Sequence, residues 1–357
     1  MSRASSTFLH TGEMPVDPET APAPRASSAT TKAPASLLRH PSGQADMNLS
    51  AEALGEAVRA GEGTLWVDID LSDPAQAKLL SDTFHFHPLA IEDALNPVSR
   101  VKVDEYPDFM LVVARVVGFC ESTPDPYDLE TANLNVFIGR HVIVTAHLEP
   151  LPVVEELMKR LRANHDLLDR GPARVAYLTL DAAVDAYFPV LDGIDEFVDE
   201  LEQRVFGHFD EQLLHEIFKV KRMVISLRRF LSPQREVLGQ LANRPSQLLP
   251  AESQLYFRDI YDHMLRITDS LDSYRDLLSS TLDGYLTQVS NRLGNVSKGL
   301  AVVGALSVPF VVVAGVYGMN FDRLPLQHHP YGFEIMLGVQ VLLGLLFVIV
   351  LRMKHML

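Results

Sequence analysis

Two long apolar segments near the carboxyl end of the chain constrain its fold most strongly. From Leu300 to Val316 there is no charged residue, and from Ile335 to Leu351 the only strongly polar side chain is Gln340. With their flanks, both segments reach the ~20 residues that cross the ~30 Å hydrocarbon core of a bilayer. A buried core helix is the alternative for either segment alone, but two in succession, joined by a short loop, predict a transmembrane hairpin.

Basic residues around this hairpin predict its orientation. Arg292 and Lys298 precede the first segment and Arg352 and Lys354 follow the second, whereas the connecting loop contains only Arg323. Because cytoplasmic flanks are enriched in Lys and Arg, we expect both chain ends on the cytoplasmic side of the cell (inner) membrane. The first residues lack a signal-peptide pattern, and the single cysteine allows no intrachain disulfide, so we expect most of the chain to work in the cytosol.

The rest of the chain divides by composition. Residues 1–46 are rich in Pro, Ala, Ser and Thr without apolar periodicity, which predicts a disordered tail. Residues 47–250 are predicted to form a cytosolic α/β domain with long acidic helices. The remaining predicted segments are the cytosolic part of a stalk helix (251–299), the first transmembrane helix (300–319), an outer loop (320–332), the second transmembrane helix (333–351) and a basic cytosolic tail (352–357). The net charge of -15 argues against nucleic acid as a partner and favours cations.

Local periodicity predicts the elements of the soluble part. The predicted strands cover residues 64–69, 109–117, 133–138 and 141–147, with Gly139-Arg140 as a hairpin turn between the last two. Between Pro189 and Pro233, apolar residues recur at three- and four-residue spacing from Ile194 to Val205, while Asp and Glu occupy the remaining surface. This pattern predicts an amphipathic helix with an acidic face.

The segment from Ala251 to Pro309 contains no internal proline and runs into the membrane without a loop signal. It predicts one helix of about 65 residues, roughly 100 Å long. A lone helix of this length needs neighbours, so we expect coiled-coil-like association between chains. Two transmembrane helices per chain cannot enclose a polar path, which suggests a homo-oligomeric pore; close helix packing is the alternative role of the small residues Gly304, Ser307, Ala314 and Gly315.

The tripeptide Gly318-Met319-Asn320 ends the first apolar segment and places a polar residue at a membrane mouth. Together with the preceding residues from Tyr285, it resembles the pore-helix signature of the CorA family of divalent-cation channels. Residues 86–96, 100–104 and 256–263 resemble further motifs of the family in the same order. The resemblance extends from about residue 60 to the end of the chain.

This resemblance implies an α+β fold: a cytosolic α/β funnel domain, a very long stalk helix and a two-helix transmembrane hairpin, assembled as a symmetric pentamer. The implied selectivity filter is Gly318, Met319 and Asn320, which binds hydrated Mg²⁺ or Co²⁺ through the water shell of the ion. A helix C-cap is the alternative role of Asn320. The implied pore-lining residues are Gly294, Ser297, Leu300, Gly304, Val308 and Val311.

The resemblance also implies cytosolic regulatory metal sites between subunits. Asp93 of one chain is expected to face Asp259 of the next, and Glu92, Asp181 and His263 are expected to form a neighbouring site. Bound Mg²⁺ would bridge the subunits and hold the pore closed, whereas its loss would let the acidic interfaces repel each other. An ordinary solvated carboxylate is the alternative for each acidic residue.

Several positions depart from the family pattern. Gly294 and Ser297 stand where the family commonly has Asn and Met, which puts a polar inner ring in doubt. In the outer loop Asp322 keeps one acidic position, but Leu326 replaces the other. His328 and His329 occupy aromatic family positions, and a histidine ring suits Co²⁺, Ni²⁺ or Zn²⁺ as well as Mg²⁺.

The resemblance therefore implies a passive Mg²⁺ channel that also carries Co²⁺, in a homopentamer within the lipid bilayer. The sequence contains no Walker-type nucleotide motif and no nucleophile with a partner base, so we expect neither a nucleotide nor enzymatic activity. One alternative is a ZntB-like Zn²⁺ transporter on the same fold. The other is a membrane-tethered metal sensor or scaffold that conducts nothing.

Overall fold

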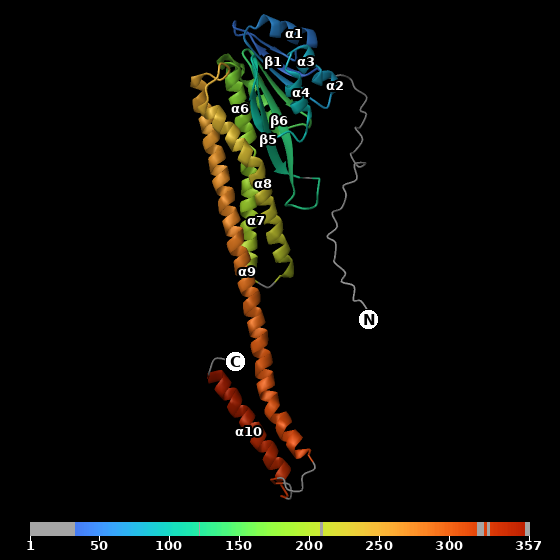
Figure 1. Ribbon diagram of the computed structural model, residues 1–357, viewed down its shortest axis with the longest axis vertical. Coiled ribbons are helices and arrows are strands. Elements are labelled where there is room, and N and C mark those ends of the chain that lie inside the picture. Colours follow the sequence, from blue (N-terminus) through green and yellow to red (C-terminus); the bar gives the residue numbers. More distant parts are fainter. Residues whose placement is uncertain (1–32, 121, 208–209, 320–324, 327–328, 354–357) are drawn as a thin grey trace, which may run out of the picture.

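The computed structural model describes residues 33–353 except for Glu121, 208–209, 320–324 and 327–328 (Figure 1). An α/β domain lies at one end of an elongated molecule, and a helix runs from it to a two-helix hairpin at the other end (Figure 1). The chain therefore has the predicted order of a mixed domain, a long helix and a hairpin.

A sheet of seven strands forms the centre of the α/β domain among the described residues, in the order β2-β1-β3-β7-β6-β5-β4. The strands are β1 (Ala35–Arg39), β2 (Ala45–Met47), β3 (Thr64–Asp70), β4 (Lys102–Glu105), β5 (Phe109–Phe119), β6 (Leu129–Gly139) and β7 (Val142–His147). Only the β3–β7 pair is parallel in this sheet. The four predicted strands are confirmed, and the predicted turn at Gly139-Arg140 connects the antiparallel strands β6 and β7.

The folded domain begins earlier than the predicted boundary at residue 47. Strand β1 and the first two residues of β2 lie inside the segment predicted to be a disordered tail, and β1 pairs with β3 from Ala35 onward. Leu37 and Leu38 of β1 are both buried, one in each of the two hydrophobic clusters that flank the sheet. The prediction was wrong here because a five-residue strand between Pro- and Ser-rich stretches shows no periodicity of its own.

Helices cover both faces of the sheet. Helices α1 (Ala51–Ala60), α2 (Pro74–Ala77), α3 (Leu79–Asp82) and α4 (Pro88–Leu95) belong to one side, and α5 (Pro152–Ala163), η1 (His165–Arg170) and α6 (Pro172–Asp185) to the other. Apolar side chains of strand β5 point alternately to the two faces of the sheet, so a helical layer must cover each face. Leu111 and Val113 pack on the α4 side, whereas Met110 and Val112 pack on the α6 side.

Three long helices extend from the α6 side. They are α7 (Phe188–Phe206), α8 (Glu211–Asn243) and α9 (Gln254–Tyr317), with the short η2 (Ala251–Ser253) before the last. In α7 the residues Ile194, Val198, Leu201 and Val205 are buried at the predicted spacing, and Asp192, Asp195, Glu196, Asp199 and Glu200 are exposed, which confirms the amphipathic acidic helix. The first half of α9 packs against α7 and α8.

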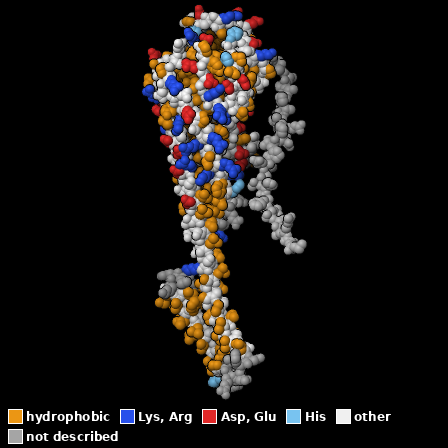
Figure 2. Space-filling model, viewed as in Figure 1, with side chains coloured by type: hydrophobic (Ala, Val, Ile, Leu, Met, Phe, Trp, Pro, Cys, Tyr) orange, Lys and Arg blue, Asp and Glu red, His pale blue; other side chains and the backbone are white. Residues whose placement is uncertain are grey.

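Helix α9 continues for 64 residues, as predicted, and its lower half leaves the bundle. Every residue from 290 to 301 is exposed in the single chain. Helix α10 (Gly332–Met353) then packs back along the end of α9. Hydrophobic side chains cover this hairpin in Figure 2, whereas charged side chains cover the α/β domain and the upper bundle. Both helices contain windows long and apolar enough to cross a membrane, within Ala251–Tyr317 and Gly332–Met353.

Candidate functional site

The transmembrane hairpin is held together by one face of α9. The phenol of Tyr317 donates a hydrogen bond to the Pro325 carbonyl at 2.8 Å, and the Gln340 amide lies 3.4 Å from the Phe310 carbonyl. A side chain at Gly344 would meet the Phe310 ring at 3.2 Å, so glycine lets the two helices approach. The α10-facing side of α9 is therefore the side that carries Phe310 and Tyr317.

The residues predicted to line the pore lie on the other side of α9. Leu300, Gly304, Val308 and Val311 follow one another at three- and four-residue spacing, which is one stripe of a helix with 3.6 residues per turn. Counted around the same helix, this stripe is opposite Leu306, Pro309 and Val313, which lie at the contact with α10. All four residues are exposed in the single chain, and so are the predicted positions Gly294 and Ser297. A single chain thus leaves this whole stripe without a partner from α10.

The predicted filter begins where α9 ends. The Gly318 N–H donates to the Ala314 carbonyl at 3.0 Å and the Met319 N–H to the Val316 carbonyl at 3.2 Å, so backbone hydrogen bonds close the last turn. The Met319 side chain is exposed. A Cβ at Gly318 would lie 3.2 Å from the Ala314 oxygen, which favours glycine at this position. The predicted residues Asn320, Asp322 and His328 lie outside the described residues.

In the outer loop, His329 is described. Its Nδ1 accepts a hydrogen bond from the Tyr331 N–H at 3.2 Å, and the two rings lie 6.3 Å apart. The imidazole therefore has a local partner, which is the ordinary role of a loop histidine, and its Nε2 remains the nitrogen that can bind a metal.

One cluster of metal-ligating side chains forms among the described residues, where α6 meets α9. It comprises Asp181, Asp185 and His263, whose ligand atoms all lie within 4.8 Å of one another. The His263 Nδ1 is 3.8 Å from the Asp185 carboxylate, and its Nε2 is 3.9 Å from that of Asp259, one helical turn before it on α9. The structure thus brings together the predicted Asp181, His263 and Asp259 and adds Asp185.

The electrostatics of this cluster favour a cation. Burial raises the pKa of Asp181 above its usual value, and the nearby Asp185 carboxylate raises it further. The Nδ1 of His263 is buried without a hydrogen-bond partner. Asp185 was not predicted from the sequence as a metal ligand, although its position four residues after Asp181 places both carboxylates on one helix face.

The other predicted metal ligands lie elsewhere in the chain. Glu92 and Asp93 are on α4, on the opposite side of the sheet from Asp181 and His263. A single chain therefore does not bring Glu92 to the α6–α9 cluster. Asp93 instead forms an ion pair with Lys102, with 2.7 Å between its Oδ2 and the Lys102 Nζ. Contact of these residues with a neighbouring chain stays a prediction.

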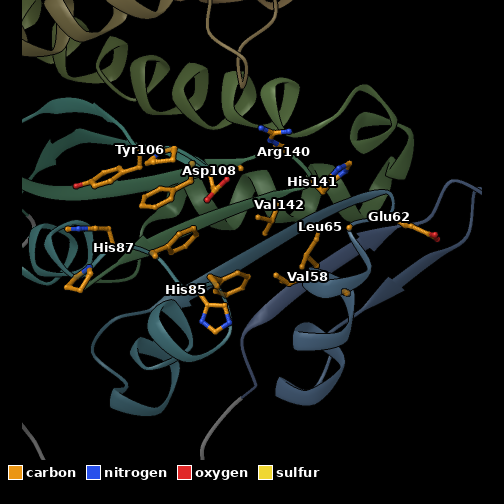
Figure 3. Close-up of a pocket in the computed structure, with 18 residues that line it drawn as sticks. Val58, Glu62, Leu65, His85, His87, Tyr106, Asp108, Arg140, His141 and Val142 are labelled. Atoms are coloured by element: carbon orange, nitrogen blue, oxygen red, sulfur yellow. The ribbon is translucent and has the colours of Figure 1, made fainter.

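A pocket of about 530 Å³ opens at one end of the sheet and was not predicted from the sequence (Figure 3). Its inner wall is aromatic, with Phe86 and Phe109 buried and with His87 stacked on Tyr106 at 5.3 Å. Arg140 and His141 are exposed at its far end (Figure 3). The aromatic wall comes from the segment before α4 and from the start of β5 with the residues just before it, which sequence periodicity does not bring together.

The fold and the hairpin define the class: an integral membrane protein in which an α/β domain is joined to the bilayer by one continuous helix. The chain belongs to the CorA family, because the model of the family described as CorA-like Mg²⁺ transporter protein matches residues 61–353. It is therefore a CorA-family divalent-cation transporter, and the predicted family resemblance is confirmed.

Individual relatives of the chain are also described as metal-ion transporters. The chain is 34% identical over 278 residues to the putative metal ion transporter YfjQ of Bacillus subtilis, covering 78% of this chain and 85% of that protein. It is 29% identical over 276 residues to the cobalt/magnesium transport protein CorA of Thermotoga maritima, covering 77% and 78%. The complete structure of the CorA magnesium transporter of Methanocaldococcus jannaschii matches with a TM-score of 0.77 at 21% identity, covering 91% of this chain and 98% of that one. This last match confirms the predicted fold.

Proposed function

We propose that the chain forms a homopentameric channel that carries Mg²⁺, and Co²⁺ as a second ion, passively into the cytosol. The observation that carries this proposal is the exposed stripe of α9 on the side away from α10, which ends at Gly318 and Met319 in a chain of the CorA family. Relatives named as cobalt/magnesium transporters support the choice of ions. Both chain ends face the cytosol in this proposal, in agreement with the basic flanks of the hairpin.

Association of chains is supported by an apolar stripe along the part of α9 that has left the bundle. Leu286, Val289, Leu293, Val296, Leu300 and Val303 alternate at spacings of three and four residues. Five of these six side chains are more than half exposed in the single chain, and Val289 is partly buried. A seven-residue apolar repeat of this kind is typical of helices that pack against copies of themselves.

The filter acts on a hydrated ion in this proposal. Mg²⁺ loses its waters reluctantly and keeps an octahedral oxygen shell, so a ring of Asn320 amide oxygens and Gly318 carbonyls would bind the water shell instead of stripping it. Below the filter, Leu300, Val308 and Val311 would form apolar constrictions that close the pore by excluding water. No step requires a nucleotide, because the membrane potential drives the cation inward.

Regulation is proposed to act through the carboxylates of the soluble domain. Asp93 of one subunit and Asp259 of the next would share a divalent cation, and Asp181, Asp185 and His263 would hold a second one. Filling these sites would stabilise the closed assembly by mass action, and emptying them would leave unbalanced negative charge between subunits. The histidine lets the second site take Co²⁺, Ni²⁺ or Zn²⁺ as well as Mg²⁺.

Ion flux into proteoliposomes tests the proposal. With the full chain reconstituted, we expect Mg²⁺ influx driven by an inside-negative potential, and Asn320→Ala should reduce it at least about tenfold, because the ring that binds the hydrated ion is lost. Gln240→Ala, which removes an exposed amide of the soluble domain, is the matched control and should leave flux unchanged. Unchanged flux in Asn320→Ala would overturn the proposed filter role of Asn320, whereas no flux in the unsubstituted chain would exclude the channel and favour a non-conducting sensor.

A Zn²⁺ transporter on the same fold is the second candidate. The observation that favours it is His329, an exposed imidazole at the outer end of the hairpin with one nitrogen available for a metal. The same liposomes, loaded with Mg²⁺- or Zn²⁺-sensitive dyes, separate the two functions. Zn²⁺ influx without Mg²⁺ influx would replace the proposed function by this one.

A further inference from the structure

The ammonium group of Lys102 forms an ion pair with Asp93, whose carboxylate is a ligand of the proposed regulatory site. Its Nζ lies 2.7 Å from the Asp93 Oδ2 and 2.7 Å from the Asp104 Oδ2, so one ammonium group bridges two carboxylates of the same chain. Roughly a third of each of these three side chains is exposed. At neutral pH an ammonium group with two carboxylate partners carries a full positive charge.

The surrounding backbone holds this bridge in place. Lys102 and Asp104 pair with Val113 and Leu111 of β5, and residues two apart on a strand point to the same side of the sheet. The loop before β4 is fixed at Ser99, whose carbonyl accepts hydrogen bonds from Arg115 at 2.9 Å and from Asn133 at 3.2 Å. The ammonium group is therefore positioned by the sheet, unlike that of a mobile surface lysine.

The ion-paired Lys102 is also surrounded by acidic side chains at a surface that is open to solvent. A cavity of about 560 Å³ is lined by Glu92, Asp93, Asp104 and Glu105, and Lys102 is the only basic residue among the described residues that line it. A divalent cation that approaches Asp93 thus finds a site with several oxygen ligands and one cation already in it.

We propose that Lys102 is a tethered competitor for the divalent cation at Asp93 and so determines the metal concentration at which the regulatory site fills. This inference rests on the proposed function of Asp93. An incoming Mg²⁺ must displace the ammonium group from Asp93 onto Asp104, or bind beside it against charge repulsion. Either route weakens binding, so the site responds to an excess of free Mg²⁺ instead of being filled permanently.

Removal of the charge is expected to tighten metal binding. In Lys102→Met, which keeps an unbranched apolar stem, the Mg²⁺ concentration that gives half-maximal protection of the full-length protein from trypsin should fall about tenfold. Lys102→Arg keeps the charge and should stay within about twofold of the unsubstituted protein, as should the exposed control Lys78→Met. A lysine with a merely structural role would behave differently, because its loss would weaken protection by Mg²⁺.

Asp93→Ala separates the failure of this inference from that of the proposed function. If Asp93→Ala raises the half-maximal Mg²⁺ concentration but Lys102→Met leaves it unchanged or raises it, the competitor role of Lys102 is overturned and the Asp93 site stands. If Asp93→Ala has no effect, regulation through Asp93 is itself wrong, and the inference falls with it. Lys102→Gln, a second neutral variant, gives the same test should Lys102→Met fail to assemble.

Discussion

Asp68 and His147 show how single residues are tuned at the carboxyl ends of the parallel strands β3 and β7. The His147 Nε2 lies 3.2 Å from the Asp68 Oδ2, and the Thr145 hydroxyl donates to the other carboxylate oxygen at 2.7 Å. Burial alone would lower the pKa of His147, but the hydrogen bond and charge of Asp68 outweigh it and raise the pKa above its usual value. The folded state therefore binds a proton more tightly than the unfolded chain.

The sign of the resulting pH dependence follows from this shift. A raised histidine pKa contributes stability that is complete below about pH 6.5, the unfolded value, and that is lost as pH rises through the higher folded value. We expect the thermal unfolding temperature of the purified protein to fall as pH increases above 6.5. Asp68→Asn should remove most of this slope and destabilise the domain by about 3 kcal/mol, because His147 loses its buried partner.

The pH series needs a control with an exposed imidazole. His141→Gln removes such a group from the β6–β7 turn and should keep the slope of the unsubstituted protein. An equal slope in Asp68→Asn and the unsubstituted protein would contradict the assignment of the pH dependence to this pair.

At the scale of elements, the hairpin of α9 and α10 depends on small residues at the helix contact. Among the described residues of α10, Gly344 faces the Phe310 ring, whereas a Cβ at Gly338 would meet nothing within 4 Å. In a bilayer, helices associate through close packing and not through the hydrophobic effect, so the size of the side chain at the contact decides how near they can come.

This difference predicts the effect of two matched substitutions. Gly344→Val should push α10 away from Phe310 and destabilise the hairpin by about 1–3 kcal/mol, the usual cost of overpacking. Gly338→Val adds the same side chain to open space and should change stability little. Thermal unfolding of both variants in one detergent measures the difference, and equal unfolding temperatures would contradict the observed packing.

At the scale of the whole molecule, α9 is the element that joins the soluble domain to the bilayer. It is packed by α7 and α8 at its start and by α10 at its end, and the exposed segment 290–301 lies between. A helix exposed on all sides needs partners to remain ordered, and the apolar stripe from Leu286 to Val303 is where a second copy would pack. Assembly and conduction are therefore coupled in the proposed function.

Leu293→Asp tests assembly through this stripe. The charge would be buried between copies, so we expect the variant to lose its oligomeric mass in light scattering at micromolar concentration. Asn295→Asp adds the same charge on another side of the helix and should keep the mass. An oligomer that persists in Leu293→Asp would show that the stalk stripe does not hold the chains together.

The sequence alone determined the features that depend on local pattern: the apolar hairpin, the 64-residue helix, the amphipathic α7, four strands and the family. Only the tertiary structure placed β1 and β2 in the sheet, added Asp185 to Asp181 and His263, and set Lys102 against Asp93. The reason is physical. The spacing of apolar residues in a segment indicates which of its faces is buried. The position of a short strand or of a charge cluster depends instead on contacts with residues far away in the chain.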